Sequence, residues 1–354
     1  MSSETEVLLF SDLHIHPHKR SQQRLEDCVG ALRWVFDTAE ANGIRNILFG
    51  GDLFHDRQKI EVFTYQRAFD TLEERMRSGK FRLYLLIGNH DLWYSDRTCV
   101  SSVKPFSALP GVTVVSDPAR MEIAGSNWDF IPFTHNPVET LELLKKMPGA
   151  PMYALGHIAL DGAILHGTQQ SDVAVEHDGD MVRISPALFS HYRHTYLGHY
   201  HAEQRVNSKV EYIGSPLQLS FGEAFQQKHL IIHDCASGER RYVANDFSPK
   251  HLVIPASERD SHDLHGNFVQ MRVDDISATD LVTLRRELQS SGSMASLEIK
   301  QQKKAMDEHV IRDAKAILYQ GDEMLERYAG EVGHEGLDLA KLLDVGRRIC
   351  QRSE

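Results

Sequence analysis

The first hundred residues alternate between short apolar runs and longer segments with helical spacing. Apolar runs at residues 7–10, 44–49 and 81–87 predict three strands. Between them, residues 25–42 and 65–77 place apolar side chains every three or four positions, which predicts two helices, each followed by a glycine. This order is typical of parallel β-α-β units, whose ligands lie beyond the carboxyl ends of the strands.

The second half of the domain predicts a second sheet packed on the first. Its apolar runs have few long helices between them and lie at residues 112–115, 128–132, 152–155, 195–197, 210–213 and 229–233. The fold class expected from both halves is α/β, a two-sheet β-sandwich flanked by helices. We assign residues 1–245 to this domain, because the pattern breaks at NDFSPKH, residues 245–251.

Two smaller parts are expected after the break. A strand at 268–273, a helix at 279–290 and a strand at 296–300 form a small α+β capping domain, residues 246–304. Residues 305–354 are expected to be a helical tail, with an amphipathic segment at 337–349. The apolar stripe of that segment packs either on a partner or on its own domain.

Composition narrows the class of protein. The chain has 354 residues, 41% hydrophobic and 25% charged, which is ordinary for globular proteins. A net charge of −11 argues against a broad basic surface for nucleic acid, although it leaves room for a local basic groove or a basic partner. The four cysteines are widely separated, as in reduced cytoplasmic proteins. We see no signal peptide and no membrane span.

Clusters of polar residues follow the predicted strands. They are SDLH with Asp12 and His14, GGDLFH with Asp52 and His55, GNHD with Asn89, His90 and Asp91, GH with His157, and GHYH with His199 and His201. Each cluster alone is more often a turn or a cap. Five in order, each placed after a strand, predict one site built of carboxylate, imidazole and amide groups at one sheet edge.

These residue types suit metal-assisted phosphodiester hydrolysis. Two divalent ions neutralise charge and activate water, and one carboxylate must bridge them; Asp52 is our choice. Mixed imidazole and oxygen ligands favour manganese, iron or zinc. His90 directly follows a ligand, so we expect it to face the substrate as proton donor or phosphate stabiliser, with Asp91 orienting its ring. The glycines before Asp52, Asn89, His157 and His199 keep bulk out of the site.

The series DLH, GDLFH, GNHD, GH and GHYH resembles the calcineurin-like metallophosphoesterase superfamily. Together with His55, YIGSPLQLSFGEA at residues 212–224 and QKH at 227–229, it is similar to the SbcD-type DNA repair nucleases, including phage relatives. The resemblance implies that Asp12, His14, Asp52 and His201 hold one metal ion, and that Asp52, Asn89, His157 and His199 hold the other. It also implies that His90 is catalytic and that His55 contacts or orients the scissile phosphate.

The resemblance further implies a biological setting. Members of that family cleave DNA with manganese as exonucleases or endonucleases, act in DNA repair and recombination, and work beside an SMC-like ATPase of the SbcC kind. They commonly form homodimers through helices near the third motif, and their C-terminal helices dock on the ATPase. We therefore expect a cytoplasmic, nucleoid-associated nuclease or its phage counterpart, with two Mn²⁺ ions and residues 305–352 as the docking segment.

Several alternatives stay open. A small-molecule or protein phosphoesterase would use the same metal core, and a non-catalytic scaffold would have lost a ligand. His166 in ILHG rivals His157, which we prefer because it follows a strand and a glycine. His16 and His18 either touch DNA phosphates or belong to a solvated loop. His135 and His191 are taken as surface residues.

Overall fold

The computed structural model describes residues 4–17, 21–94, 99–134, 136–166, 169–170, 174–177, 180–274, 276–291 and 294–301. The described residues fall into two compact units. The first holds those within Met1–Met271 and Gln289–Glu298, and the second holds those within Arg272–Leu288 and from Ile299 onward. The predicted tail, 305–354, lies outside the described residues. The predicted domain boundaries therefore stay predictions.

The first sheet carries the β-α-β units predicted from the amino-terminal pattern. Its strand order is β16-β15-β1-β2-β3-β4, in which β1 to β4 are parallel. The strands are β1 (Glu6–Phe10), β2 (Asn46–Phe49), β3 (Arg82–Leu86), β4 (Val112–Val115), β15 (His229–Asp234) and β16 (Arg240–Ala244). The connecting helices are α1 (Gln22–Ala41), which Ser21 caps through the backbone N–H of Arg24, and α2 (Val62–Met76).

The second sheet has the order β13-β14-β12-β7-β6-β5, with its central strands parallel. Its members are β5 (Ala119–Ile123), β6 (Ser126–Ile131), β7 (Tyr153–His157), β12 (His194–Gly198), β13 (Gln204–Arg205) and β14 (Val210–Tyr212). Around it lie α3 (Pro137–Lys145) and two short hairpins, β8 (Ile164–His166) with β9 (Gln169–Gln170) and β10 (Ala174–His177) with β11 (Asp180–Arg183).

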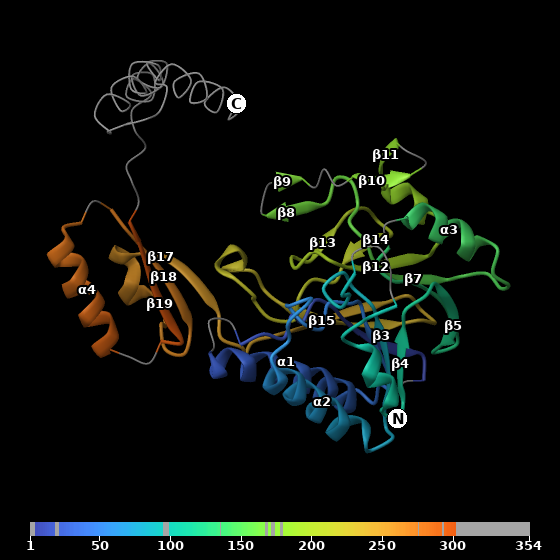
Figure 1. Cartoon of the computed structure of the whole chain (residues 1–354), viewed down its shortest axis with the longest axis horizontal. Helices are drawn as coiled ribbons and strands as arrows, with labels where there is room; N and C mark the ends of the chain where they lie inside the picture. Colours follow the sequence, from blue (N-terminus) through green and yellow to red (C-terminus); the bar gives the residue numbers. More distant parts are fainter. Residues whose placement is uncertain are drawn as a thin grey trace, which may run out of the picture. The chain divides into compact units, whose positions relative to one another are not determined.

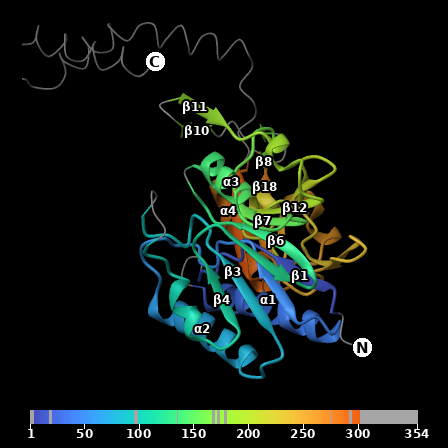
Figure 2. The same ribbon diagram turned by 90° about the vertical axis from the view of Figure 1, so that its right-hand side faces the viewer.

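Alternating side chains explain why the two sheets stack. In β1, Leu8 and Phe10 join a cluster with the helices α1 and α2, whereas Val7 and Leu9 join a cluster with Trp128 of the second sheet. A third cluster packs the outer face of the second sheet against α3. Figures 1 and 2 show the resulting layers: α1 and α2, the first sheet, the second sheet, then α3. The predicted two-sheet sandwich is confirmed, although β4 and β15, which we expected in the second sheet, pair with strands of the first.

The remaining elements include the predicted α+β unit. Its sheet has the order β17-β18-β19, formed by β17 (His251–Pro255), β18 (Phe268–Val273) and β19 (Ser296–Gln301), with α4 (Ala278–Ser291) between the last two. The predicted break at NDFSPKH is a turn, in which Asn245 Oδ1 accepts the backbone N–H groups of Phe247 and Ser248. Short 3₁₀ turns complete the chain at Lys104–Ala108, Pro186–Phe189, Phe221–Glu223 and Ala256–Ser261.

Candidate metal centre

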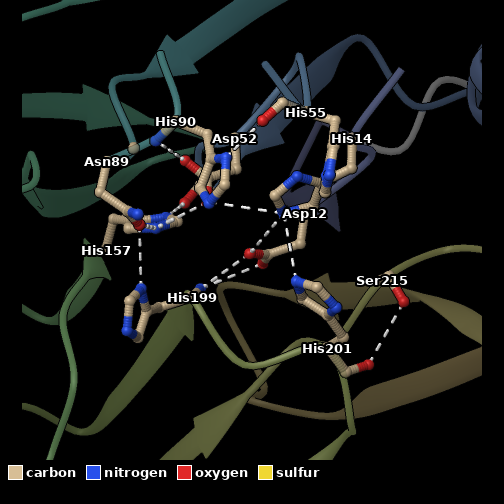
Figure 3. A network of polar contacts seen from close by, with 12 residues as sticks. Asp12, His14, Asp52, His55, Asn89, His90, His157, His199, His201 and Ser215 are labelled. Carbon is tan, nitrogen blue, oxygen red and sulfur yellow. Dashed lines mark hydrogen bonds and ion pairs between the residues drawn. The ribbon is translucent and has the colours of Figure 1, made fainter. Parts of the chain in front are cut away.

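All seven predicted metal ligands lie in one connected network at the carboxyl ends of the central strands (Figure 3). Asp12, Asp52 and Asn89 follow β1, β2 and β3 of the first sheet. His157 ends β7 and His199 follows β12 of the second sheet. The parallel arrangement of both sheets therefore carries these side chains to the same edge, as the sequence pattern predicts.

Four of the seven residues adopt a backbone conformation that side chains other than glycine rarely take. The φ angles are +54° at Asp12, +47° at His14, +63° at Asp52 and +103° at His199. Such positions cost of order 1–3 kcal/mol each and persist where the surrounding fold imposes them. Their concentration in one network indicates that the fold gives up stability to aim these side chains inward.

Glycines make room for the network. A Cβ atom on Gly88 would lie 2.2 Å from Asp52 Oδ1, and one on Gly51 would lie 2.5 Å from His157 Nδ1. At Gly198 the added atom would meet Ser11 Oγ at 2.3 Å. These glycines therefore keep bulk out of the site, as predicted. At Gly156 the nearest atom is only a flexible Leu197 methyl group, so this glycine is less essential to the site.

One half-site is formed by Asp12, His14, Asp52 and His201. His14 Nε2 lies 3.1 Å from His201 Nε2, 3.5 Å from Asp52 Oδ2 and 3.9 Å from Asp12 Oδ1. Two ring nitrogens that face each other beside two carboxylates bring several lone pairs together. That arrangement fits a divalent cation of the manganese, iron or zinc type.

The other half-site is formed by Asp52, Asn89, His157 and His199. Asn89 Oδ1 lies 2.9 Å from His157 Nε2 and 3.0 Å from His199 Nδ1. His157 Nδ1 donates to the carbonyl of Gly50 at 2.7 Å, which leaves its Nε2 lone pair to face the centre. Asp52 Oδ2 lies 3.4 Å from His157 Nε2 and also faces His14, so it belongs to both half-sites, as expected of a bridging ligand.

The amide of Asn89 has two orientations with different partners. With Oδ1 toward His157 and His199, its lone pairs face a cation. Turned over, the amide nitrogen donates to both rings, and Oδ1 accepts from Arg57 Nη2 at 2.5 Å. The first orientation suits an occupied centre, and the second satisfies the hydrogen bonds without a metal ion.

The charges of the centre favour exchange of protons for cations. Burial alone would lower the pKa of His157, but the charge of Asp52 and its hydrogen bond raise the pKa to about 9. Burial alone would raise the pKa of Asp52, yet the neighbouring His157 lowers it. Burial also raises the pKa of Asp12 to about 6. A bound cation would therefore replace protons in this network.

His90 and His55 lie at the rim of the centre. The backbone N–H of His90 donates to Asp52 Oδ1 at 2.7 Å, and its ring Nδ1 contacts the carbonyl oxygen of His55. The rings of His55 and His90 stack with centroids 5.6 Å apart. Because Nδ1 is tied to a carbonyl, Nε2 is the nitrogen that His90 can offer to a substrate.

Asp91 does not orient the ring of His90, contrary to prediction. Its carboxylate accepts three buried backbone N–H groups, from Asp52 at 2.8 Å, Gly88 at 2.9 Å and Leu53 at 3.0 Å. The orienting contact of His90 is the carbonyl of His55 instead. Asp91 therefore ties the loop after β3 to the loop after β2.

The other histidines from the sequence fall in different places. His16 Nε2 lies 3.2 Å from Asp56 Oδ2, and its ring is 5.0 Å from that of His55, so it belongs to the rim. His191 is exposed, as expected. His166 lies in the backbone of β8, whereas the ring of His157 contacts Asn89 in the network. His18 and His135 lie outside the described residues.

Two further residues support the centre and were not assigned a role from the sequence. Glu223 Oε1 lies 3.1 Å from His201 Nδ1, and Lys228 Nζ lies 2.7 Å from Glu223 Oε2. One feature of the sequence could have indicated this pair: Lys228 directly precedes the apolar strand β15, and a lysine is rarely buried there without an acidic partner. Burial alone would raise the pKa of Glu223, but the hydrogen bond from His201 and the charge of Lys228 lower it to about 2.

Within the part of the chain that the structure describes, no helix has the length and apolar character needed to cross a membrane.

A comparison with known protein families agrees with the geometry. The family described as calcineurin-like phosphoesterase matches residues 5–203, a stretch that contains all seven residues of the two half-sites. No curated protein matches the chain significantly. Among solved structures, the crystal structure of a dimetal phosphatase from Danio rerio is similar over 69% of this chain and 99% of that chain, with 10% identity and a TM-score of 0.39. The match to more than half of the sequence shows that the chain belongs to the calcineurin-like phosphoesterase family.

Proposed function

We propose that the protein is a two-metal DNA nuclease, the SbcD-type subunit of an ATP-driven repair and recombination complex. The observation that carries the phosphodiesterase part is the placement of His90. Its backbone is fixed to Asp52, which both half-sites share, and its ring is fixed by the carbonyl of His55. His90 Nε2 is thereby held beside the position where a phosphate would meet the metal centre.

The residues of the chain divide the work of hydrolysis among them. The residues of the two half-sites would hold two divalent ions, proposed to be Mn²⁺, which supply charge neutralisation and an activated water when bound. His90 holds a proton near the leaving oxygen or stabilises the phosphate, and His55 keeps the His90 ring in place. Asp91 holds the backbone of Asp52 so that its carboxylate stays between the half-sites.

The rim supports a polyanionic substrate such as DNA. Beyond the centre, the exposed segment after β2 carries His55, Arg57 and Lys59, and His16 lies beside His55. In the orientation of Asn89 that suits the centre without a metal ion, Arg57 Nη2 donates to its amide oxygen, so the guanidinium lies next to the two half-sites. Cationic and imidazole groups that extend past the centre suit a chain with several phosphates better than a single phosphomonoester.

We also propose the partners implied by the resemblance. The net charge of −11 fits a nuclease whose ATPase partner binds the duplex. That partner would dock on residues 305–352 of this chain.

The second proposed partner is another copy of this chain, which would cover apolar side chains near α2. Val62 is 82% and Phe63 53% exposed, and Tyr65 of the same helix donates to the carbonyl of Ser102. Trp93, whose backbone N–H donates to the carbonyl of Val100, is 48% exposed. Sedimentation of wild type against Phe63→Glu tests the homodimer, which the variant is expected to dissociate.

The experiment that tests the function is cleavage of linear double-stranded DNA by the purified protein. Wild type, His90→Ala and the exposed control His265→Ala are compared with Mn²⁺, with Mg²⁺ and with chelator. We expect manganese-dependent cleavage by wild type and by His265→Ala, and loss in His90→Ala. Turnover of an aryl phosphodiester without DNA cleavage, even with an SbcC-like ATPase added, would leave the metal chemistry in place and reject the nuclease.

A further inference from the structure

A buried ion pair lies behind one of the two half-sites. The side chains of Glu223 and Lys228 are 7% and 5% exposed, and Lys228 Nζ lies 2.7 Å from Glu223 Oε2. Ser215 Oγ and the backbone N–H of Leu219 add hydrogen bonds to the same carboxylate oxygen, at 3.3 Å and 3.2 Å. The carboxylate is therefore fully partnered and fixed in direction before any metal ion binds.

The ion pair contacts both the ring and the backbone carbonyl of His201. Glu223 Oε1 lies 3.1 Å from His201 Nδ1, and Lys228 Nζ donates to the carbonyl oxygen of His201 at 2.8 Å. The backbone N–H of Ser215 donates to that same carbonyl at 3.0 Å. Figure 3 shows Ser215 beside the His201 carbonyl and the His201 ring turned toward Asp12 and His14. Ring and backbone of His201 are thus held by neighbouring charges.

The contact to Glu223 fixes the tautomer of His201. An imidazole Nδ1–H that donates to a carboxylate leaves the lone pair on Nε2. Nε2 is the atom that lies 3.1 Å from His14 Nε2 in the first half-site. By contrast, His199 in the second half-site faces Asn89 through its Nδ1, so the two half-sites do not share this support.

A buried carboxylate in an ion pair also occurs elsewhere in this fold, and its partners among the described residues include none of the seven predicted ligands. Glu211 is fully buried and accepts from Arg240 Nη1 and from Tyr242 Oη, each at 3.1 Å. Burial of a charge pair is therefore not in itself a sign of a metal site, because it also serves packing. What distinguishes Glu223 and Lys228 is that both converge on one ligand residue.

We propose that Glu223 and Lys228 are positioning residues that set the metal affinity of the half-site of Asp12, His14, Asp52 and His201 independently of the other half-site. The inference rests on the metal chemistry of the proposed function and does not depend on DNA as the substrate. Removal of such a carboxylate behind a ligating histidine typically lowers metal affinity 10–100-fold. The second half-site should keep its affinity.

The test is a calorimetric titration of the metal-free protein with Mn²⁺. Wild type is compared with Glu223→Ala and with Glu211→Gln, a control that alters a buried carboxylate whose partners are Arg240, Tyr242 and His194 rather than a predicted ligand. We expect two bound ions in each protein. In Glu223→Ala one affinity should fall about 10–100-fold while the other stays unchanged. In Glu211→Gln both affinities should match wild type.

A second variant separates loss of the two charges from misfolding of the site. Glu223→Gln with Lys228→Met removes both charges but keeps the shape of the pair, and the glutamine oxygen still accepts from His201 Nδ1. This double variant should lose less affinity than Glu223→Ala, at the same half-site. Electron paramagnetic resonance at two equivalents of Mn²⁺ should show coupled ions in wild type and added signal from isolated ions in Glu223→Ala.

Two results would overturn the proposal. Unchanged affinities in both variants would show that His201 needs no such support. An equal fall of both affinities, together with a lower melting temperature of the metal-free protein, would show a merely structural role. Absence of DNA cleavage would reject the proposed nuclease and leave the titration as a separate result, so the two failures are distinguishable.

Discussion

Asp91 accepts the backbone N–H of Asp52 at 2.8 Å, across 39 residues of sequence. The same carboxylate oxygen accepts from Gly88 at 2.9 Å, and the other accepts from Leu53 at 3.0 Å. One buried side chain thus joins the loops after β2 and β3. The shared residue of the two half-sites owes its position to a carboxylate that is not itself one of the predicted metal ligands.

Replacement of this carboxylate should cost stability. In Asp91→Asn, an amide –NH₂ must face one of the three backbone N–H groups, so at least one buried donor loses its acceptor. We expect the free energy of unfolding to fall by about 2 kcal/mol. Urea denaturation in the presence of chelator measures the change. The exposed Asp263, which accepts the backbone N–H of His265, gives the matched control Asp263→Asn, expected within about 0.5 kcal/mol of wild type.

Gly88→Ala should disable the centre through a single methyl group. The new Cβ would lie 2.2 Å from Asp52 Oδ1 and 2.5 Å from Asp52 N, so the carboxylate must move. We expect at least a tenfold loss of Mn²⁺ affinity, measured by titration. Gly30→Ala is the matched control, since Gly30 lies inside α1 with nothing within 4 Å of its added Cβ. That control should gain about 0.5–1 kcal/mol of stability and keep metal binding. Equal behaviour of the two variants would contradict the steric account.

Arg57→Gln tests the proposed phosphate contact at the rim. We expect weaker DNA binding for every sequence tried and a salt dependence whose slope falls by about 1 unit, as for the loss of one phosphate contact. Binding to DNA is measured at several salt concentrations with a catalytically inactive His90→Ala background. Arg82→Gln is the control, because Arg82 is exposed at the start of β3, at the opposite end of the strand. An unchanged slope in Arg57→Gln would place this residue outside the DNA contact.

Glu211 should confer a stability that depends on pH. Burial alone would raise its pKa, but hydrogen bonds from His194 and Tyr242 and the charge of Arg240 lower it. A carboxyl whose folded-state pKa is lowered stabilises the protein above its unfolded pKa of about 4.5, and this stabilisation is lost as the pH falls below it. Glu211→Gln should therefore be less stable than wild type at pH 7, by about 2 kcal/mol, with a gap that narrows below pH 4.5. Thermal unfolding across pH 3.5–7 checks this, and a constant gap would contradict it.

Much of the fold could be predicted from the sequence, because clear apolar runs and helical spacing mark most of its strands and helices. Strand β4 and strand β18 have the predicted bounds, since their apolar runs end at turns on both sides. The antiparallel edge strand β5 was not predicted, because ARMEI is half polar and lies at the margin of the sheet, where less of it is buried. Hairpins such as β10 with β11 carry too few apolar residues to be read from periodicity.

The site divides in the same way. Asp12, Asp52 and Asn89 could be predicted to meet because each follows a parallel strand, and strand direction alone carries them to one edge. The role of Asp91 could not, since a residue adjacent to His90 in sequence can point elsewhere when the chain turns between them. The roles of Glu223 and Lys228 could not be predicted, because they depend on contacts with His201. That residue lies in the connection between β12 and β14, far from both in sequence.

The two half-sites draw their side chains from both sheets: Asp12, His14, Asp52 and Asn89 come from the first, and His157, His199 and His201 from the second. A cation bound by ligands from both sheets is a reversible cross-link between the two layers at one rim of the sandwich. Its removal would take away this cross-link and leave the other contacts at that rim in place, such as the hydrogen bond from the backbone N–H of Phe133 to the carbonyl of Ile87. Chelation should then speed amide hydrogen exchange at the carboxyl ends of β1, β2, β7 and β12, while the opposite rim exchanges as before. The supply of metal would thus control how often this rim of the domain opens, as well as its chemistry.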